Sequence, residues 1–201
     1  MLNIHHTHLG QIKTYKHGQI IDLANPTADN IYIGDISTAL SKICRFGGHT
    51  EEFYSVAQHS VLVCMLAPIH LKAAALLHDA TEAYLGDVVK PLKVLLGKPY
   101  TDLEDKCEAV IIQKFGLSKE HLQQVKVFDK LALEIENDAL RKGNNTNLRK
   151  QLDNVMYYYS IDLFWEPHQA NEIFMALFNK YVLKSKESPQ PPDWYINTPR
   201  P

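Results

Sequence analysis

The sequence predicts an all-α protein that carries a small β-hairpin near its N-terminus. From about residue 35 onward, apolar side chains recur every three or four positions in successive stretches, which is the spacing of amphipathic helices. Glycine or proline separates most of these stretches, as is typical of helix ends. The hairpin is expected at about residues 11–23, where isoleucine and threonine side chains flank the turn-forming triplet Lys16-His17-Gly18.

The predicted helices start where a capping residue or a proline precedes an apolar pattern. Asp35 is expected to cap the first helix, which continues to the loop Phe46-Gly47-Gly48. Thr101 and Glu104 have the spacing of a capping box for a later helix. The other predicted helices are 55–67, 73–86, a short one from Pro91, 101–115, 118–142, 148–163 and 167–184.

Length and composition are those of one globular domain. We place it at residues 1–187, followed by a proline-rich tail at 188–201 that is either disordered or anchored through Trp194 on the body or on a neighbouring subunit. Of the 201 residues, 45% are hydrophobic and 22% charged, which is ordinary for a soluble protein. The net charge of −2 provides no basic footprint for a nucleic-acid duplex.

No stretch of the sequence predicts an association with a membrane. The longest uncharged apolar run, residues 61–69, is too short to span a bilayer. The N-terminus lacks the basic flank and apolar core of a signal peptide. We therefore expect a cytoplasmic protein.

The stretch AAALLHDATEAYLGD, residues 73–87, carries ionisable side chains inside an apolar run. On a helix, His78, Asp79 and Glu82 project from one side of a single turn. Burying carboxylates beside an imidazole costs several kcal/mol unless each group is paired, hydrogen-bonded or bound to a metal. The arrangement therefore predicts either a metal site or a hydrogen-bonded core pair.

Two more polar side chains occupy helix positions where a hydrophobic residue belongs. His59 falls on the apolar stripe of helix 55–67, and Asp129 lies in the middle of the stripe of helix 118–142, facing the core. Together with His78 and Asp79 they make two imidazoles and two carboxylates. This mixed set suits an octahedral divalent ion such as manganese, iron, cobalt or nickel, with zinc possible, and leaves positions open for water and substrate.

The order His59, His78-Asp79, Asp129 on successive helices resembles the HD-domain metal-dependent phosphohydrolases. The extended motifs are similar to those of the 5′-deoxynucleotidase branch: ICRFGGH (43–49), YSVAQHS (54–60), HDATEAYLGD (78–87) and KPLK (90–93). They are closer still to its small bacterial and bacteriophage members, which include deoxyadenosine triphosphate triphosphohydrolases. The resemblance covers about residues 10–142. It implies an HD-domain helical bundle and a homo-oligomer.

The resemblance also implies a catalytic centre. His59, His78, Asp79 and Asp129 would hold the catalytic metal, which would be Mn²⁺, Co²⁺, Fe²⁺, Ni²⁺ or Zn²⁺, with Mg²⁺ as a second ion. Glu82, together with Asp79, would handle the proton of the attacking water or of the leaving oxygen. A divalent ion at this position would polarise a phosphoryl oxygen and activate water.

Substrate contacts are implied on both sides of this centre. Arg45 matches a phosphate-binding arginine, and Lys93 and His49 are further phosphate candidates. Phe46 stands where related deoxynucleotidases carry tryptophan, and it offers a flat surface to the base.

Asp87 and Pro91, which follow the HD motif in the sequence, complete the implied nucleotide pocket. Asp87 would accept a hydrogen bond from a sugar hydroxyl, and Pro91 would close the other side of the base pocket. The substrate expected from these matches is a 2′-deoxynucleoside 5′-phosphate.

The residues leave the reaction open between two outcomes. Hydrolysis of a triphosphate would release triphosphate, hydrolysis of a monophosphate would release orthophosphate, and Lys93 slightly favours the triphosphate. A phosphodiesterase acting on cyclic or oligomeric nucleotides is an alternative that requires a wider cleft. A non-catalytic, metal-containing nucleotide-binding module is a second alternative, and a purely structural helical protein is a third.

Overall fold

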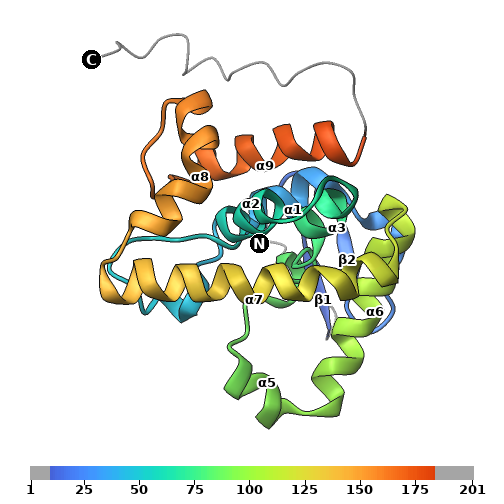
Figure 1. The fold of residues 1–201 in the computed structure, drawn as a ribbon. Coiled ribbons are helices and arrows are strands. Elements are labelled where there is room, and N and C mark those ends of the chain that lie inside the picture. The colour runs from blue at the N-terminus through green and yellow to red at the C-terminus, as the bar shows by residue number, and fades with distance from the viewer. Residues whose placement is uncertain (1–9, 184–201) are drawn as a thin grey trace, which may run out of the picture.

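The protein is built almost entirely of helices, as the computed structural model shows (Figure 1), and the structure describes residues 10–183. A two-stranded antiparallel hairpin, β1 (Gln11–Lys13) and β2 (Ile20–Asp22), precedes the helices, with Ile12 opposite Ile21. The prediction of a helical protein with a small N-terminal hairpin is therefore confirmed. The tail predicted at 188–201 lies outside the described residues.

The helices follow one another through short turns and three 3₁₀ segments, η1 to η3. The side chain of Ser55 caps α2, and that of Ser118 caps α7. The helix bounds are α1 (Ile33–Leu40), α2 (Val56–Leu66), α3 (Lys72–Leu77), α4 (Glu82–Leu85), α5 (Lys90–Leu96), α6 (Lys98–Phe115), α7 (Lys119–Lys142), α8 (Thr146–Tyr159) and α9 (Pro167–Tyr181), and the 3₁₀ bounds are η1 (Ala28–Asn30), η2 (Arg45–Gly48) and η3 (Ile69–Leu71).

Helix α2 forms the centre of the core. Helices α1, α3, α7, α8 and α9 all pack against it, and α7 and α9 lie on opposite sides of it in Figure 1. Every residue from Val56 to Cys64 is buried, so the helix is covered on all sides and not only along the single stripe predicted from its sequence. A helix that is apolar almost all round is stable only in such an interior position. His59 is therefore fixed deep in the protein.

The first helix differs from its prediction at both ends. It ends at Leu40, several residues before the predicted loop Phe46-Gly47-Gly48. Helix α1 begins two residues before Asp35, and Tyr32 at its N-cap makes no side-chain cap. The Asp35 carboxylate instead accepts hydrogen bonds from the backbone amides of Lys16 and His17 and lies 3.0 Å from the His17 ring nitrogen. Asp35 thus holds the hairpin turn against the helical body.

The helix predicted at 73–86 is interrupted at the HD motif. Helix α3 ends at Leu77, and α4 starts at Glu82 after a turn with i→i+3 hydrogen bonds, one of which joins the Glu82 amide to the Asp79 carbonyl at 3.0 Å. Residues three apart eclipse each other in such a turn. Asp79 and Glu82 therefore still project from the same side. Gly86, with φ of 78°, ends α4.

Helix α6 begins at Lys98, three residues before the predicted capping box. Its N-cap is Gly97, the Thr101 hydroxyl donates to the Lys98 carbonyl, and Glu104 pairs with Lys93. The capping-box prediction is therefore wrong, because the chain enters the helix directly from α5.

Helix α5 projects from the body below α7 in Figure 1 and packs on α6. None of its residues is buried, and Val94 and Leu95 are 72% and 83% exposed. In the described part of the chain, no helix is both long and apolar enough to cross a bilayer.

Candidate metal centre and substrate cleft

Four side chains from three segments meet beside the core and form the His–Asp cluster. His59 comes from α2, His78 and Asp79 from the turn after α3, and Asp129 from α7. Asp129 Oδ1 lies 3.1 Å from His59 Nε2 and 3.8 Å from His78 Nε2. Asp79 Oδ2 lies 3.4 Å from His59 Nε2 and 3.2 Å from His78 Nε2. The four predicted ligands are thus brought together.

The donor atoms of this cluster suit a divalent cation. Ligand atoms about 2.1 Å from one ion lie roughly 3 to 4 Å from each other, which is the range of the separations above. The Nε2 atoms of His59 and His78 are buried and make no hydrogen bond to the described residues. His59, His78 and Asp129 could therefore hold a metal ion. Asp79 lies within 3.4 Å of both imidazole nitrogens, but it is not part of this three-residue group.

Burial and neighbouring charges shift the pKa values of the side chains in the cluster. Burial by itself lowers the pKa of the His78 imidazole, but the Asp79 carboxylate raises it well above its usual value. Burial raises the pKa of the Asp129 and Asp79 carboxyls, and the neighbouring imidazoles overcome this and hold both below their usual range. Protons and a metal cation compete for such nitrogens. Asp129 itself is 43% exposed and lines a cleft, whereas its sequence position predicted that it faces the core.

Glu82 lies beside the cluster with an unused oxygen. It is 7% exposed, and its Oε2 is buried without a hydrogen-bond partner in the described chain. Burial, and then the charges of Asp79 and Asp87, raise the pKa of Glu82 to about 9. Without a bound cation its carboxyl is therefore neutral near pH 7 and can donate a proton.

Arg45 reaches the cluster from η2. Its Nη2 lies 3.0 Å from Glu136 Oε2, and its Nη1 lies 3.8 Å from Asp79 Oδ2. Burial opposes the charge on the guanidinium, but Glu136 and then Asp79 raise the pKa of Arg45 above its usual value. The next residue, Phe46, has a φ of 57°, a left-handed conformation that is rare for an aromatic residue, and its ring centre lies 5.5 Å from the guanidinium carbon. Such outliers cluster at functional sites.

A cleft of about 640 Å³ opens in front of these groups. Asp87 lies in its wall, where burial and nearby Asp79 raise the pKa of this carboxyl although Arg45 opposes them. Lys93 also lines the cleft, with its ammonium 2.7 Å from Glu104. The lining residues are Arg45, Phe46, Asp79, Glu82, Asp87, Val88, Val89, Lys90, Lys93, Lys126, Asp129 and Leu133.

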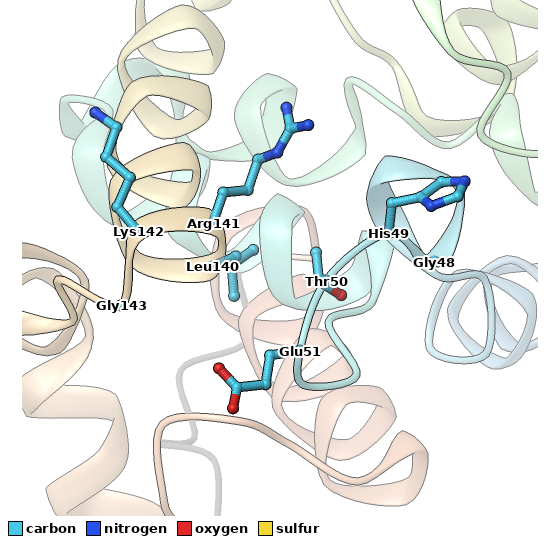
Figure 2. A pocket seen from close by; sticks show the side chains of 8 residues that line it. All are labelled: Gly48, His49, Thr50, Glu51, Leu140, Arg141, Lys142 and Gly143. Atoms are coloured by element: carbon cyan, nitrogen blue, oxygen red, sulfur yellow. The ribbon is translucent and has the colours of Figure 1, made fainter.

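Two predicted substrate residues lie away from this lining. Pro91 is exposed in the first turn of α5, one residue after Lys90. His49 lines a second hollow of about 770 Å³ between the 48–51 loop and the end of α7. Figure 2 shows Arg141 and Lys142 on the helix side of this hollow, with His49 and Glu51 on the loop side. The charged side chains of this second hollow are exposed, and the His–Asp cluster lies elsewhere. We therefore place the candidate site in the cleft of about 640 Å³.

Three residues on α7 belong to the site but were not predicted. Lys126, Leu133 and Glu136 lie three residues before, four after and seven after Asp129, so all share its helix face. That spacing was the available signal. Glu136 is completely buried and contacts both Arg45 and His59.

These features define a helical protein with a candidate divalent-metal centre in the wall of a charged cleft. The protein YfdR of Escherichia coli strain K12 is 49% identical over 153 residues, which cover 75% of this chain and 84% of YfdR. The chain therefore belongs to the same family as YfdR. A protein of Rhodobacter capsulatus is 40% identical over 109 residues, which cover 50% of this chain and 56% of that protein. Both relatives are uncharacterized, and no protein-family model matches the chain.

Proposed function

We propose that the protein is an HD-domain phosphohydrolase that hydrolyses 2′-deoxynucleoside 5′-phosphates with the help of a divalent metal. One observation carries the proposal: two buried imidazole nitrogens without hydrogen bonds face Asp129 and Asp79 beside a cleft that also contains Arg45. Asp129 lies 3.1 Å from His59 Nε2 and Asp79 lies 3.2 Å from His78 Nε2, but neither contact has the alignment of a hydrogen bond. A structural core pair would align its donors and acceptors, whereas a metal site leaves such nitrogens available to a ligand.

The residues around the cluster can divide the chemistry among themselves. A bound divalent ion would polarise the phosphoryl group and supply an activated water. The Glu82 carboxyl lines the cleft beside the cluster and can handle the proton of the attacking water or of the leaving oxygen. Arg45, held by Glu136, offsets negative charge on the phosphoryl oxygens.

The cleft walls favour a nucleotide as the substrate. The ring of Phe46 lines the cleft beside Arg45 and offers a surface for a base, next to where a phosphate would bind. Asp87 also lines this cleft and can accept a hydrogen bond from a sugar hydroxyl.

Cationic side chains in the same cleft favour a triphosphate over a monophosphate. Lys90 and Lys126 are exposed and line the cleft, whereas the ammonium of Lys93 is engaged by Glu104. A chain of three phosphates would bring more negative charge to these lysines than a single phosphate.

The test is product analysis by chromatography. The purified protein is supplied separately with Mn²⁺, Co²⁺ and Mg²⁺ and incubated with the four deoxynucleoside mono- and triphosphates and their ribose counterparts. Deoxynucleoside plus triphosphate identifies a triphosphohydrolase, and deoxynucleoside plus orthophosphate identifies a 5′-nucleotidase. Asp79→Ala, prepared in parallel, controls for a contaminating phosphatase.

Absence of any metal-dependent product would contradict the proposal. Cyclic dinucleotides and short oligonucleotides would then test the phosphodiesterase alternative, and binding without turnover would favour the nucleotide-binding module. The homo-oligomer stays a prediction from the resemblance, and the cytoplasmic location stays a prediction from the sequence. Light scattering at micromolar concentration tests the oligomer, and a monomer would contradict it.

A further inference from the structure

Glu136 is a completely buried carboxylate that bridges two functional side chains. Its Oε1 lies 2.6 Å from His59 Nδ1, and its Oε2 lies 3.0 Å from Arg45 Nη2. Both partners are buried as well, with His59 at 0% exposure and Arg45 at 9%. Each oxygen therefore contacts a different partner: Oε1 contacts His59 of the His–Asp cluster, and Oε2 contacts Arg45, which is proposed to bind phosphate.

Burial of the Glu136 carboxylate costs solvation free energy. A carboxylate removed from water must recover the lost solvation from its partners, and an apolar residue often fills such a position with no loss of stability. Neighbouring positions on the same helix face, Ala132, Ile135 and Ala139, are apolar and buried. Packing alone therefore does not require a carboxylate at this position.

The contact with His59 determines which ring nitrogen is free. A carboxylate can only accept, so the Nδ1–H of His59 donates to Glu136. In the neutral ring the remaining nitrogen, Nε2, then carries the lone pair and faces Asp79 and Asp129. Metal-binding histidines characteristically have such a partner, which fixes the tautomer and makes the nitrogen a stronger donor.

We propose that Glu136 is a positioning residue that presents His59 Nε2 to a divalent cation and anchors Arg45 to the same rigid unit. The contact with Arg45 fixes where a phosphate can bind relative to the metal. This second half rests on the proposed function, whereas the first half requires only that the His–Asp cluster binds a metal. Glu136 itself touches neither metal nor substrate.

The test compares Glu136→Gln with wild type and with a matched control, Glu134→Gln. Gln keeps the size of the side chain but removes its charge and adds a donor group. Glu134 lies two residues earlier on α7 and is exposed. Free Mn²⁺ is titrated by electron paramagnetic resonance, and the melting temperature is measured with and without Mn²⁺.

The expected result is a loss of Mn²⁺ affinity of about 10- to 100-fold in Glu136→Gln, a smaller rise of melting temperature on adding Mn²⁺, and no change in Glu134→Gln. Glu136→Asp keeps the charge, so it should bind Mn²⁺ with an affinity between those of wild type and Glu136→Gln. It also serves as the test if Glu136→Gln fails to fold. Wild-type Mn²⁺ affinity in a folded Glu136→Gln, or in a folded Glu136→Asp if Gln fails, would overturn the proposal.

Inhibition of nucleotide hydrolysis by inorganic phosphate tests the contact between Glu136 and Arg45. With Mn²⁺ at saturation, the phosphate concentration for half-inhibition should rise at least about 5-fold in Glu136→Gln, because Arg45 is no longer held. An unchanged value would overturn this half. Wild-type protein that binds Mn²⁺ but hydrolyses no nucleotide would contradict the proposed function and leave the role of Glu136 toward His59 intact.

Discussion

The two walls of the cleft differ in how firmly the protein holds them. The inner wall comes from η2, the turn after α3, α4 and α7. Behind it His59 and Glu136 are completely buried, and Glu136 contacts both His59 and the buried Arg45 of the wall. The outer wall comes from the residues before α5 and from α5 itself, in which no residue is buried. One wall is part of the core, while the other projects into solvent.

This difference indicates a division of labour. Metal binding and proton transfer need side chains fixed to within a fraction of an ångström, which a packed core provides. Substrate binding tolerates a wall whose contacts are few, such as the pair between Lys93 and Glu104. Changes among the buried polar groups of the inner side should therefore abolish activity, and changes in the outer wall or at exposed side chains should adjust affinity.

The largest effect is expected from His59→Ala. Loss of this proposed ligand should abolish metal binding and reduce the proposed hydrolysis by about 10³-fold or more, because a catalytic ion supplies several kcal/mol of transition-state stabilisation. Metal content by mass spectrometry and hydrolysis rates measure the two outcomes. His70→Ala, an exposed histidine, is the control. Full metal content in His59→Ala would place the metal elsewhere.

Glu82→Gln should separate catalysis from metal binding. Gln occupies the same volume but cannot transfer a proton, so hydrolysis should fall about 10²- to 10⁴-fold while metal content stays unchanged. Glu120→Gln, on the exposed face of α7, should behave as wild type. A Glu82→Gln protein with normal turnover would remove the proposed role of this carboxyl.

The stability of the metal-free protein should report the unusual environment of Glu82. Its folded pKa, about 9, lies above the ordinary value of 4.5, so the folded state keeps a proton that the unfolded state loses as the pH rises. This contribution to stability is complete below pH 4.5 and declines up to about pH 9. Glu82→Gln should therefore lose less stability than wild type between pH 5 and pH 8, by on the order of 3 kcal/mol. Urea unfolding with chelator present measures it, and parallel pH profiles would contradict it.

Some residues of the candidate site can be predicted from the sequence and others cannot, depending on the pattern of residues around them. His59, His78 and Asp129 could be found because each is a polar residue inside an apolar pattern. Glu136 was missed because it stands in the largely polar run Glu134-Ile135-Glu136-Asn137-Asp138, whose composition is typical of an exposed helix surface. Only packing against α2 and η2 shows that one of the two glutamates is buried and the other exposed.

Other differences came from contacts between distant segments. Asp35 has the sequence features of a helix cap, but its carboxylate binds the hairpin turn almost twenty residues earlier. Glu104 has the spacing of a capping box, but it pairs with Lys93 from the preceding helix. Local rules describe what a residue can bind, and tertiary contacts decide which partner it meets.

On the cleft face of α7, Lys126→Ala should weaken binding of triphosphates specifically. The KM for a deoxynucleoside triphosphate should rise about 3- to 10-fold, with little change in kcat, because an exposed charged contact contributes modestly. The KM for a monophosphate should stay near its wild-type value. Lys130→Ala, exposed one turn later, is the control. Equal effects on both substrates would argue against a phosphate chain reaching Lys126.

The smallest effect is expected at the tip of the outer wall. Leu95 is 83% exposed, so Leu95→Ala should change the free energy of unfolding of the monomer by no more than about 0.5 kcal/mol. Leu62, completely buried in α2, should lose about 2 to 5 kcal/mol on the same substitution, because its removal leaves a cavity. Urea unfolding at low protein concentration measures both. If Leu95→Ala costs as much as Leu62→Ala, α5 is packed in solution, and the outer wall is as firmly held as the inner one.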